Sequence, residues 1–93
     1  MAYKFLVHHV GDSVGVAVED IKAGEEVQGV FLDDDSTTVV VAKAAVPLGH
    51  KIALNDVPKE DSIIEYQEKI GVATENIKKG DYVHTHNLKT ARW

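Results

Sequence analysis

The chain carries two histidines one residue apart, His84 and His86, followed directly by Asn87. On a β-strand, residues i and i+2 share a face and their Cα atoms lie about 6.6 Å apart, so both imidazoles could converge on one metal ion or one anionic ligand. Two ligands do not fill a coordination sphere, and the spacing alone slightly favours a solvent-facing pair. Asn87 would lie on the opposite face of such a strand, either as a ligand-binding amide or as a residue that ends the strand.

A second candidate is the dipeptide His50-Lys51, which follows the glycine of a predicted turn. The corresponding position in two related turns holds Glu25 or Asp81, so the turn itself does not require a histidine. An ammonium group and an imidazole on a rigid turn could bind the carboxylate of an acidic ligand. The alternative is an exposed turn with a solvated lysine.

Two further groups of residues are candidates, the first of second rank for the site and the second for a partner interface. His8 and His9 precede a turn with their side chains on opposite faces of the first predicted strand, and Asp12 could orient the outer imidazole through a hydrogen bond. Arg92 and Trp93 are residue types that often anchor protein interfaces. We therefore predict that they contact a partner; the alternative is that Trp93 folds back over the core.

The elements that must position these residues are predicted to be strands. Short Val-rich segments alternate with turn signals, and no window has the apolar periodicity of an amphipathic helix. The acidic run 33–35 lacks the spacing of an EF-hand calcium loop and is predicted to connect a hairpin. The predicted strands are Lys4–His9, Ser13–Val18, Glu26–Leu32, Thr37–Ala42 and Tyr82–Asn87.

An internal repeat is the strongest signal in the sequence. Residues 16–27 and 72–83 match at seven of twelve positions, and residues 41–52 and 52–63 follow the pattern more loosely, with Glu60 where the others have glycine. Each unit predicts an elbow, in which a strand end leads through a short turn and a residue at positive φ into a new strand. Each turn has one aliphatic anchor, and we expect the four anchors to meet in one small core: Ile21, Val46, Val57 and Ile77.

Length and composition restrict the class of protein. A chain of 93 residues without a linker predicts one domain over residues 1–93. A net charge of −5 without a basic cluster disfavours nucleic acid and anionic membranes as partners. The absence of cysteine excludes disulfides and fits a reducing compartment, and the first residues resemble neither a signal peptide nor a membrane span. We therefore expect a cytoplasmic protein.

Three segments together carry a family resemblance: "VGDSVGVAVEDIKAGEEV", "PLGHKIALNDV" and "IGVATENIKKGDYVHTHN". They resemble the SAF domain, and within that group the branch found in altronate and galactarate dehydratases, across essentially the whole chain. The resemblance implies a mostly β, β-clip fold with short 3-10 turns and pseudo-symmetric elbows. In those dehydratases a large catalytic domain follows the HTHN segment, whereas this chain continues for only six residues.

The resemblance therefore implies the small accessory subunit of a two-component lyase, such as sulfolactate sulfo-lyase or a split sugar-acid dehydratase. The implied partner is a large catalytic subunit holding a divalent, iron-like metal, with no cofactor in this chain. The implied substrate is a sugar acid or a sulfonated hydroxy acid, bound with help from His50, Lys51, His84, His86 and Asn87. The alternatives are a carbohydrate or sugar-acid binding module without catalytic activity, and a homo-oligomeric structural domain.

Overall fold

The computed structural model describes residues 3–90, which form nine short strands and no helix. This confirms the predicted mostly β fold. The strands are β1 Phe5–Val7, β2 Val14–Ala17, β3 Glu26–Phe31, β4 Thr37–Val41, β5 Lys51–Ala53, β6 Ser62–Glu65, β7 Glu68–Ala73, β8 Tyr82–Val83 and β9 Leu88–Thr90.

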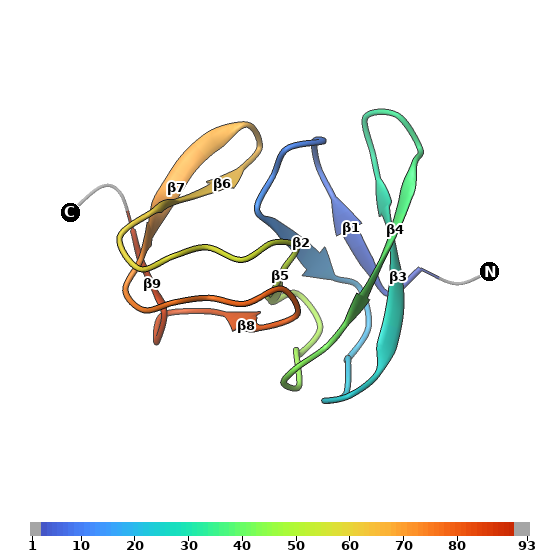
Figure 1. Ribbon diagram of the computed structural model, residues 1–93. Coiled ribbons are helices and arrows are strands. Elements are labelled where there is room, and N and C mark those ends of the chain that lie inside the picture. Colours follow the sequence, from blue (N-terminus) through green and yellow to red (C-terminus); the bar gives the residue numbers. More distant parts are fainter. Residues whose placement is uncertain (1–2, 91–93) are drawn as a thin grey trace.

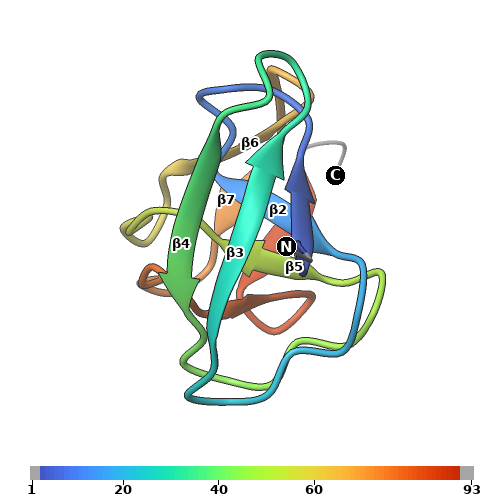
Figure 2. The ribbon, with the colours of Figure 1, turned by 90° about the vertical axis from the view of Figure 1, so that its right-hand side faces the viewer.

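The strands form two sheets. The larger sheet has the order β4-β3-β1-β2-β5-β8, and the smaller has the order β6-β7-β9 (Figure 1). Strands β1 and β3 are parallel, whereas the other paired strands of residues 3–90 are antiparallel. Figure 2 shows β4, β3 and β1 side by side in front of β2 and β5, so the larger sheet is strongly curved.

Four elbows of nine residues each, numbered 17–25, 42–50, 53–61 and 73–81, share one hydrogen-bond pattern. In elbow 1, Gly24 donates its N–H to the carbonyl of Ala42, and the carbonyl of Glu25 accepts the N–H of the same alanine. Each elbow also has one i to i+3 hydrogen bond, so the short turns are single turns and not helices. The other elbows repeat the alanine pattern through Gly49 and His50 with Ala17, Glu60 and Asp61 with Ala73, and Gly80 and Asp81 with Ala53.

The alanine bonds join the elbows in reciprocal pairs. Elbow 1 binds the alanine that begins elbow 2, and elbow 2 binds the alanine that begins elbow 1. Elbows 3 and 4 are joined in the same way. In each pair the two anchors form a β-bridge, Ile21 with Val46 and Val57 with Ile77.

The prediction that the four anchors meet in one core is wrong, because each pair lies in its own cluster of buried residues. The first cluster contains Ile21 and Val46 and fills the inside of the curved sheet around Phe5. The second contains Val57 and Ile77 and lies between the two sheets. Alternation of side chains along β2 and β5 explains the division, because neighbouring residues of one strand point to opposite faces.

The predicted strand bounds differ from the observed ones in two ways. Four predicted strands are present but shorter at one or both ends, and the fifth, Tyr82–Asn87, ends at Val83. Strands β5, β6, β7 and β9 were not predicted. Residues 3–90 contain no helix that is long and apolar enough to cross a membrane.

Glu60 offers a test of the elbow geometry. It has φ +77°, close to the +85° of Gly24 in elbow 1, although it is not a glycine. A left-handed conformation costs a residue with a Cβ about 1–2 kcal/mol, and a glycine at the same place avoids this cost. Glycine also loses more backbone entropy on folding, which offsets part of the stabilisation. We expect Glu60→Gly to raise the free energy of unfolding by up to about 1 kcal/mol in urea denaturation.

Gly24→Ala is the matched control. A Cβ at Gly24 would meet no atom within 4 Å, so the substitution tests backbone strain without a clash. We expect it to lower the free energy of unfolding by about 1–2 kcal/mol. Equal effects of the two substitutions, or a loss of stability in Glu60→Gly, would contradict the shared elbow geometry.

Candidate functional site

The segment after β8 is a turn and not the predicted strand. The carbonyl of His84 accepts the N–H of Asn87 at 3.1 Å and that of Leu88 at 2.9 Å. The Asn87 side chain completes the turn, because its Oδ1 accepts the N–H of His84 at 2.9 Å and its Nδ2 donates to the carbonyl of Tyr82 at 2.8 Å. Asn87 is only 3% exposed, so its amide is used inside the protein.

Tyr82 is the centre of a group of aromatic rings, which we term the Tyr82 cluster and which contains His50, Tyr82, His84 and His86. The rings of Tyr82 and His84 are stacked, with centroids 5.5 Å apart and planes 8° apart. The centroid of the His86 ring lies 5.6 Å from that of Tyr82. His84 and His86 are exposed and Tyr82 is half-buried, so the two imidazoles are available to a ligand.

His50 joins this cluster from elbow 2. Its Nδ1 lies 2.6 Å from the Tyr82 hydroxyl, and its ring centroid lies 4.9 Å from that of His84. The direction of the hydrogen bond depends on the tautomer of the imidazole. The strand register explains the contact between His50 and Tyr82. Ile52 is paired with Tyr82, and His50, two residues before Ile52, projects to the same side of the chain as Ile52.

Pro47 explains why the His50 side chain is not used by its own turn. In elbows 1 and 4 the residue at this position, Glu25 or Asp81, accepts the backbone N–H of a lysine three residues before it. In elbow 2 that place is occupied by Pro47, which has no N–H to donate. The imidazole of His50 can therefore turn toward Tyr82 without leaving a turn donor unpaired.

Lys51 lies on the other face of β5 and is not brought together with the histidines. It is paired with Val83, whose side chain lies in the cluster of buried residues between the sheets. Its Nζ is 3.9 Å from Oε1 of Glu65, and Nε2 of His8 is 3.9 Å from Oε2 of the same carboxylate. The predicted His50-Lys51 pair is therefore divided between two faces of the sheet.

Asp12 does not orient an imidazole, contrary to the prediction. Its buried carboxylate accepts backbone N–H groups from His9, Tyr66 and Gln67, at 3.3, 3.0 and 3.1 Å. The His9 ring instead faces Asp33, with Nδ1 3.8 Å from Oδ2. His8 and His9 follow β1, which ends at Val7, so they do not lie on the predicted strand. Their rings have different neighbours, since the His8 ring stacks on that of Tyr66.

The acidic run 33–35 joins β3 to β4, as predicted. Both the hydroxyl and the N–H of Ser36 donate to Oδ1 of Asp34, at 2.6 and 2.9 Å. These hydrogen bonds lower the pKa of Asp34 below its usual range, so its carboxylate remains charged in the turn.

The Tyr82 cluster does not form a metal site by itself. No group of three or more His, Cys, Asp or Glu side chains in residues 3–90 is placed to hold a metal ion. The rings of His84 and His86 both contact the Tyr82 ring. The two histidines lie in a turn, so they do not have the i, i+2 strand geometry that the prediction of a shared metal assumed. Residues 3–90 therefore supply no complete set of metal ligands around these two histidines, and their possible role as metal ligands stays a prediction.

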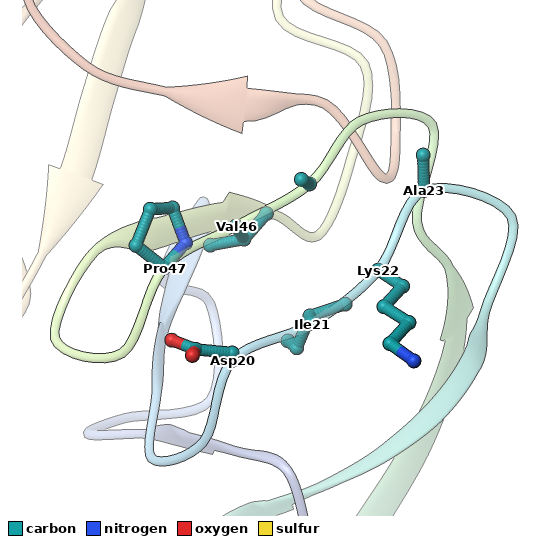
Figure 3. A pocket seen from close by; sticks show the side chains of 7 residues that line it. Asp20, Ile21, Lys22, Ala23, Val46 and Pro47 are labelled. Atoms are coloured by element: carbon teal, nitrogen blue, oxygen red, sulfur yellow. The ribbon is translucent and has the colours of Figure 1, made fainter.

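A shallow hollow of about 400 Å³ lies between elbows 1 and 2, and none of the predicted site residues lines it. Figure 3 shows Ile21, Val46 and Pro47 along it, with the side chains of Asp20 and Lys22 beside them. The carboxylate of Asp20 accepts the N–H of Leu48 at 2.9 Å, so its polar group is already used. Arg92 and Trp93 lie outside the described residues, and their interface role stays a prediction.

The curved larger sheet, the smaller sheet and the four reciprocal elbows define a β-clip domain. The chain belongs to the altronate/galactarate dehydratase SAF domain family, whose model matches residues 3–91. This confirms the resemblance found in the sequence.

Three relatives show how this domain occurs in other proteins. The chain is 40% identical to (2R)-sulfolactate sulfo-lyase subunit alpha of Chromohalobacter salexigens over 94 aligned positions that cover all of both chains. It is 44% identical to the subunit of the same name from Paracoccus pantotrophus, over 69% of this chain and 96% of that one. The altronate dehydratase of Bacillus subtilis is 35% identical over 92% of this chain, which corresponds to 16% of that enzyme.

Sequence reasoning missed the two residues around which the polar side chains gather. Tyr82 had a signal in the sequence that went unused, since it precedes His84 by two positions and His86 by four. Glu65 had no local signal, because its neighbours His8 and Lys51 come from distant parts of the chain.

The role of Asn87 can be tested by its removal. Asn87→Ala leaves the N–H of His84 and the carbonyl of Tyr82 without their partners, and a buried unsatisfied group costs about 1–3 kcal/mol. We expect a corresponding loss in the free energy of unfolding in urea denaturation. Thr85→Ala, in the exposed middle of the same turn, is expected to change this free energy by less than about 0.5 kcal/mol. Comparable losses in both variants would contradict the role of the Asn87 amide.

Proposed function

We propose that this chain is the small subunit of a two-component lyase and contributes the Tyr82 cluster to a substrate site that a large subunit completes. The match with a sulfo-lyase subunit alpha over the full length of both chains carries this proposal. A subunit designation implies a partner chain in that relative. We infer a partner of the same kind for this chain.

The Tyr82 cluster has the chemistry to bind an anionic group. A neutral imidazole donates one hydrogen bond and an imidazolium donates from both ring nitrogens, and hydrogen bonds to charged groups are stronger than neutral ones. The hydrogen bond to Tyr82 occupies Nδ1 of His50, which leaves its Nε2 for a ligand. We assign the carboxylate or sulfonate of a hydroxy acid to His50, His84 and His86, with Asn87 holding the turn that carries two of them.

The family resemblance indicates how the two subunits would share the reaction. We assign the expected divalent metal to the large subunit, as the resemblance implies. We also assign to that subunit the removal of a proton α to the carboxylate. The small subunit binds and orients the substrate, which is a sulfonated hydroxy acid if the leaving group is sulfite, or a sugar acid if it is water.

Reconstitution with a large lyase subunit from the same organism tests the proposal. We expect the two chains to elute as one complex from a sizing column and to release sulfite from sulfolactate or water from a sugar acid. The double substitution His84→Ala plus His86→Ala removes hydrogen bonds to a charged group, each worth about 1.5–3 kcal/mol, so we expect kcat/KM to fall at least tenfold. Tyr82→Phe removes only the hydroxyl contact with His50 and is expected to have a smaller effect.

Thr85→Ala is the control for the same turn and is expected to keep full activity in the complex. Failure of the two chains to associate would contradict the subunit assignment. Unchanged turnover after loss of both histidines, with the complex intact, would contradict the substrate-binding role of the Tyr82 cluster.

A further inference from the structure

Strand β4 is an unprotected edge of the larger sheet. It stands last in the strand order and, among the strands of residues 3–90, pairs only with β3 (Figure 2). Its five residues are all β-branched, and it has none of the lysines, prolines or bulges with which proteins usually protect such an edge. Val39 and Val41 are 48% and 52% exposed. The strand therefore offers backbone groups and apolar side chains to another strand.

The other sheet edges differ from β4. Strand β8 has only two residues, and the three-residue strand β9 carries the exposed Lys89. In β6 the register shifts between Ile63 and Ile64, and Ser13 donates its N–H to the Ile64 carbonyl at 2.8 Å. Of the edges that residues 3–90 form, β4 is thus the one that is both regular and uncovered.

The backbone hydrogen bonds show which groups of β4 face outward. The carbonyl of Ser36 accepts an N–H from β3, and the N–H of Ala42 donates to the residue that precedes β3. Residues alternate along an antiparallel ladder, so the even-numbered residues of β4 turn their backbone groups toward β3. Thr37 and Val39 therefore turn their N–H and carbonyl groups away from the sheet.

Elbow 4 limits the open part of this edge. Lys43 donates its N–H to the carbonyl of Gly80 at 2.9 Å, on the side of the chain away from β3. A Cβ at Gly80 would collide with the carbonyl oxygen of Val41, so the elbow also covers the edge at that residue. The stretch that is free to pair is therefore 37–39.

The charges at the two ends of β4 are opposite. The acidic run 33–35 precedes the strand, exposed Lys43 follows it, and exposed Lys79 adjoins Gly80 in elbow 4. Among residues 3–90 neither lysine forms an ion pair. A second β4 that runs antiparallel brings its acidic run toward these lysines, whereas a parallel one brings two acidic runs together. The charges therefore match an antiparallel copy of this chain.

We propose that two copies of this chain pair through β4 in an antiparallel dimer with two-fold symmetry. Thr37 of one copy exchanges N–H and carbonyl hydrogen bonds with Val39 of the other, and the symmetry repeats this exchange around an axis at Thr38. Each copy uses its edge once, so the assembly is closed. Strand β8 stands at the opposite end of the larger sheet, so both Tyr82 clusters stay open in the dimer. The dimer does not depend on the proposed lyase function.

Disulfide cross-linking tests the axis, because the chain has no cysteine of its own. In the proposed register the two Thr38 residues form a pair without direct hydrogen bonds, whose Cα atoms lie about 4.5 Å apart, within the range of about 4.4–6.8 Å for a disulfide. We expect Thr38→Cys to give a covalent dimer on a non-reducing gel after mild oxidation. Thr85→Cys, in the exposed turn after β8, is expected to stay largely monomeric. Equal cross-linking of the two variants would overturn the proposal.

Sedimentation equilibrium of the chain by itself tests the edge, over micromolar to millimolar concentrations. We expect the mass to approach that of two chains. Val39→Lys adds a charge of the kind that protects natural edges and is expected to weaken the dimer at least tenfold. Leu48→Lys makes the same change at a residue of elbow 2 that is 60% exposed, and is expected to leave the dimer unchanged. A monomer at all concentrations, or equal dimerisation of the two variants, would overturn the proposal.

Charge reversal provides a second measurement if Val39→Lys fails to fold. We expect Lys43→Glu to weaken the dimer severalfold, because it places a carboxylate beside the acidic run of the other copy. Lys69→Glu makes the same change in exposed β7 and is expected to have no effect on the dimer. Equal effects of these two variants would overturn the proposal. A monomeric chain whose complex with a large lyase subunit is lost in Val39→Lys would show that the edge binds that subunit, and would also overturn it.

Discussion

The reciprocal hydrogen bonds between elbows and alanines are the constraint on which the rest of the structure depends. Each elbow presents an N–H and a carbonyl to the alanine that begins its partner elbow, so neither elbow of a pair can keep its shape alone. These bonds require a residue at positive φ, and three of the four elbows use glycine there. They also join the anchors in pairs, which creates one cluster of buried residues for each pair.

The positions of the Tyr82 cluster and of the Lys51–Glu65 ion pair follow from this constraint. Elbow 2 delivers the chain into β5 immediately after Gly49, so His50 and Lys51 stand at the start of a strand where successive side chains alternate between faces. His50 thereby contacts Tyr82 on one face, and Lys51 approaches Glu65 on the other. His50 and Lys51 therefore belong to two separate groups of side chains. A shift of the β5 register by one residue would exchange the faces on which these two side chains lie.

The elbows could be predicted from the sequence because each repeat places a residue suited to positive φ, usually glycine, at the same position of the turn. Even Glu60, which breaks the glycine pattern, has the positive φ that its place in the repeat predicts. The pairing of elbows could not be predicted, because it depends on backbone bonds to alanines that carry no distinctive side chain. Strand β8 has two residues and β5 three, too few for an alternating pattern to show. The end of β8 depends on buried Asn87, whose amide competes with strand pairing.

The position of the Tyr82 cluster explains why its imidazoles remain open. Strand β8 is the last strand of the larger sheet, so the cluster stands at a sheet edge and not in a closed cavity. On this edge His84 and His86 are exposed, while Tyr82 is half-buried beneath them and is joined to His50. A small ligand held only by these rings would stay exposed to water, where hydrogen bonds to charge are weak. A second protein surface that covers the edge would exclude water and strengthen each of those bonds, which is the physical reason why the proposed substrate site requires a partner chain.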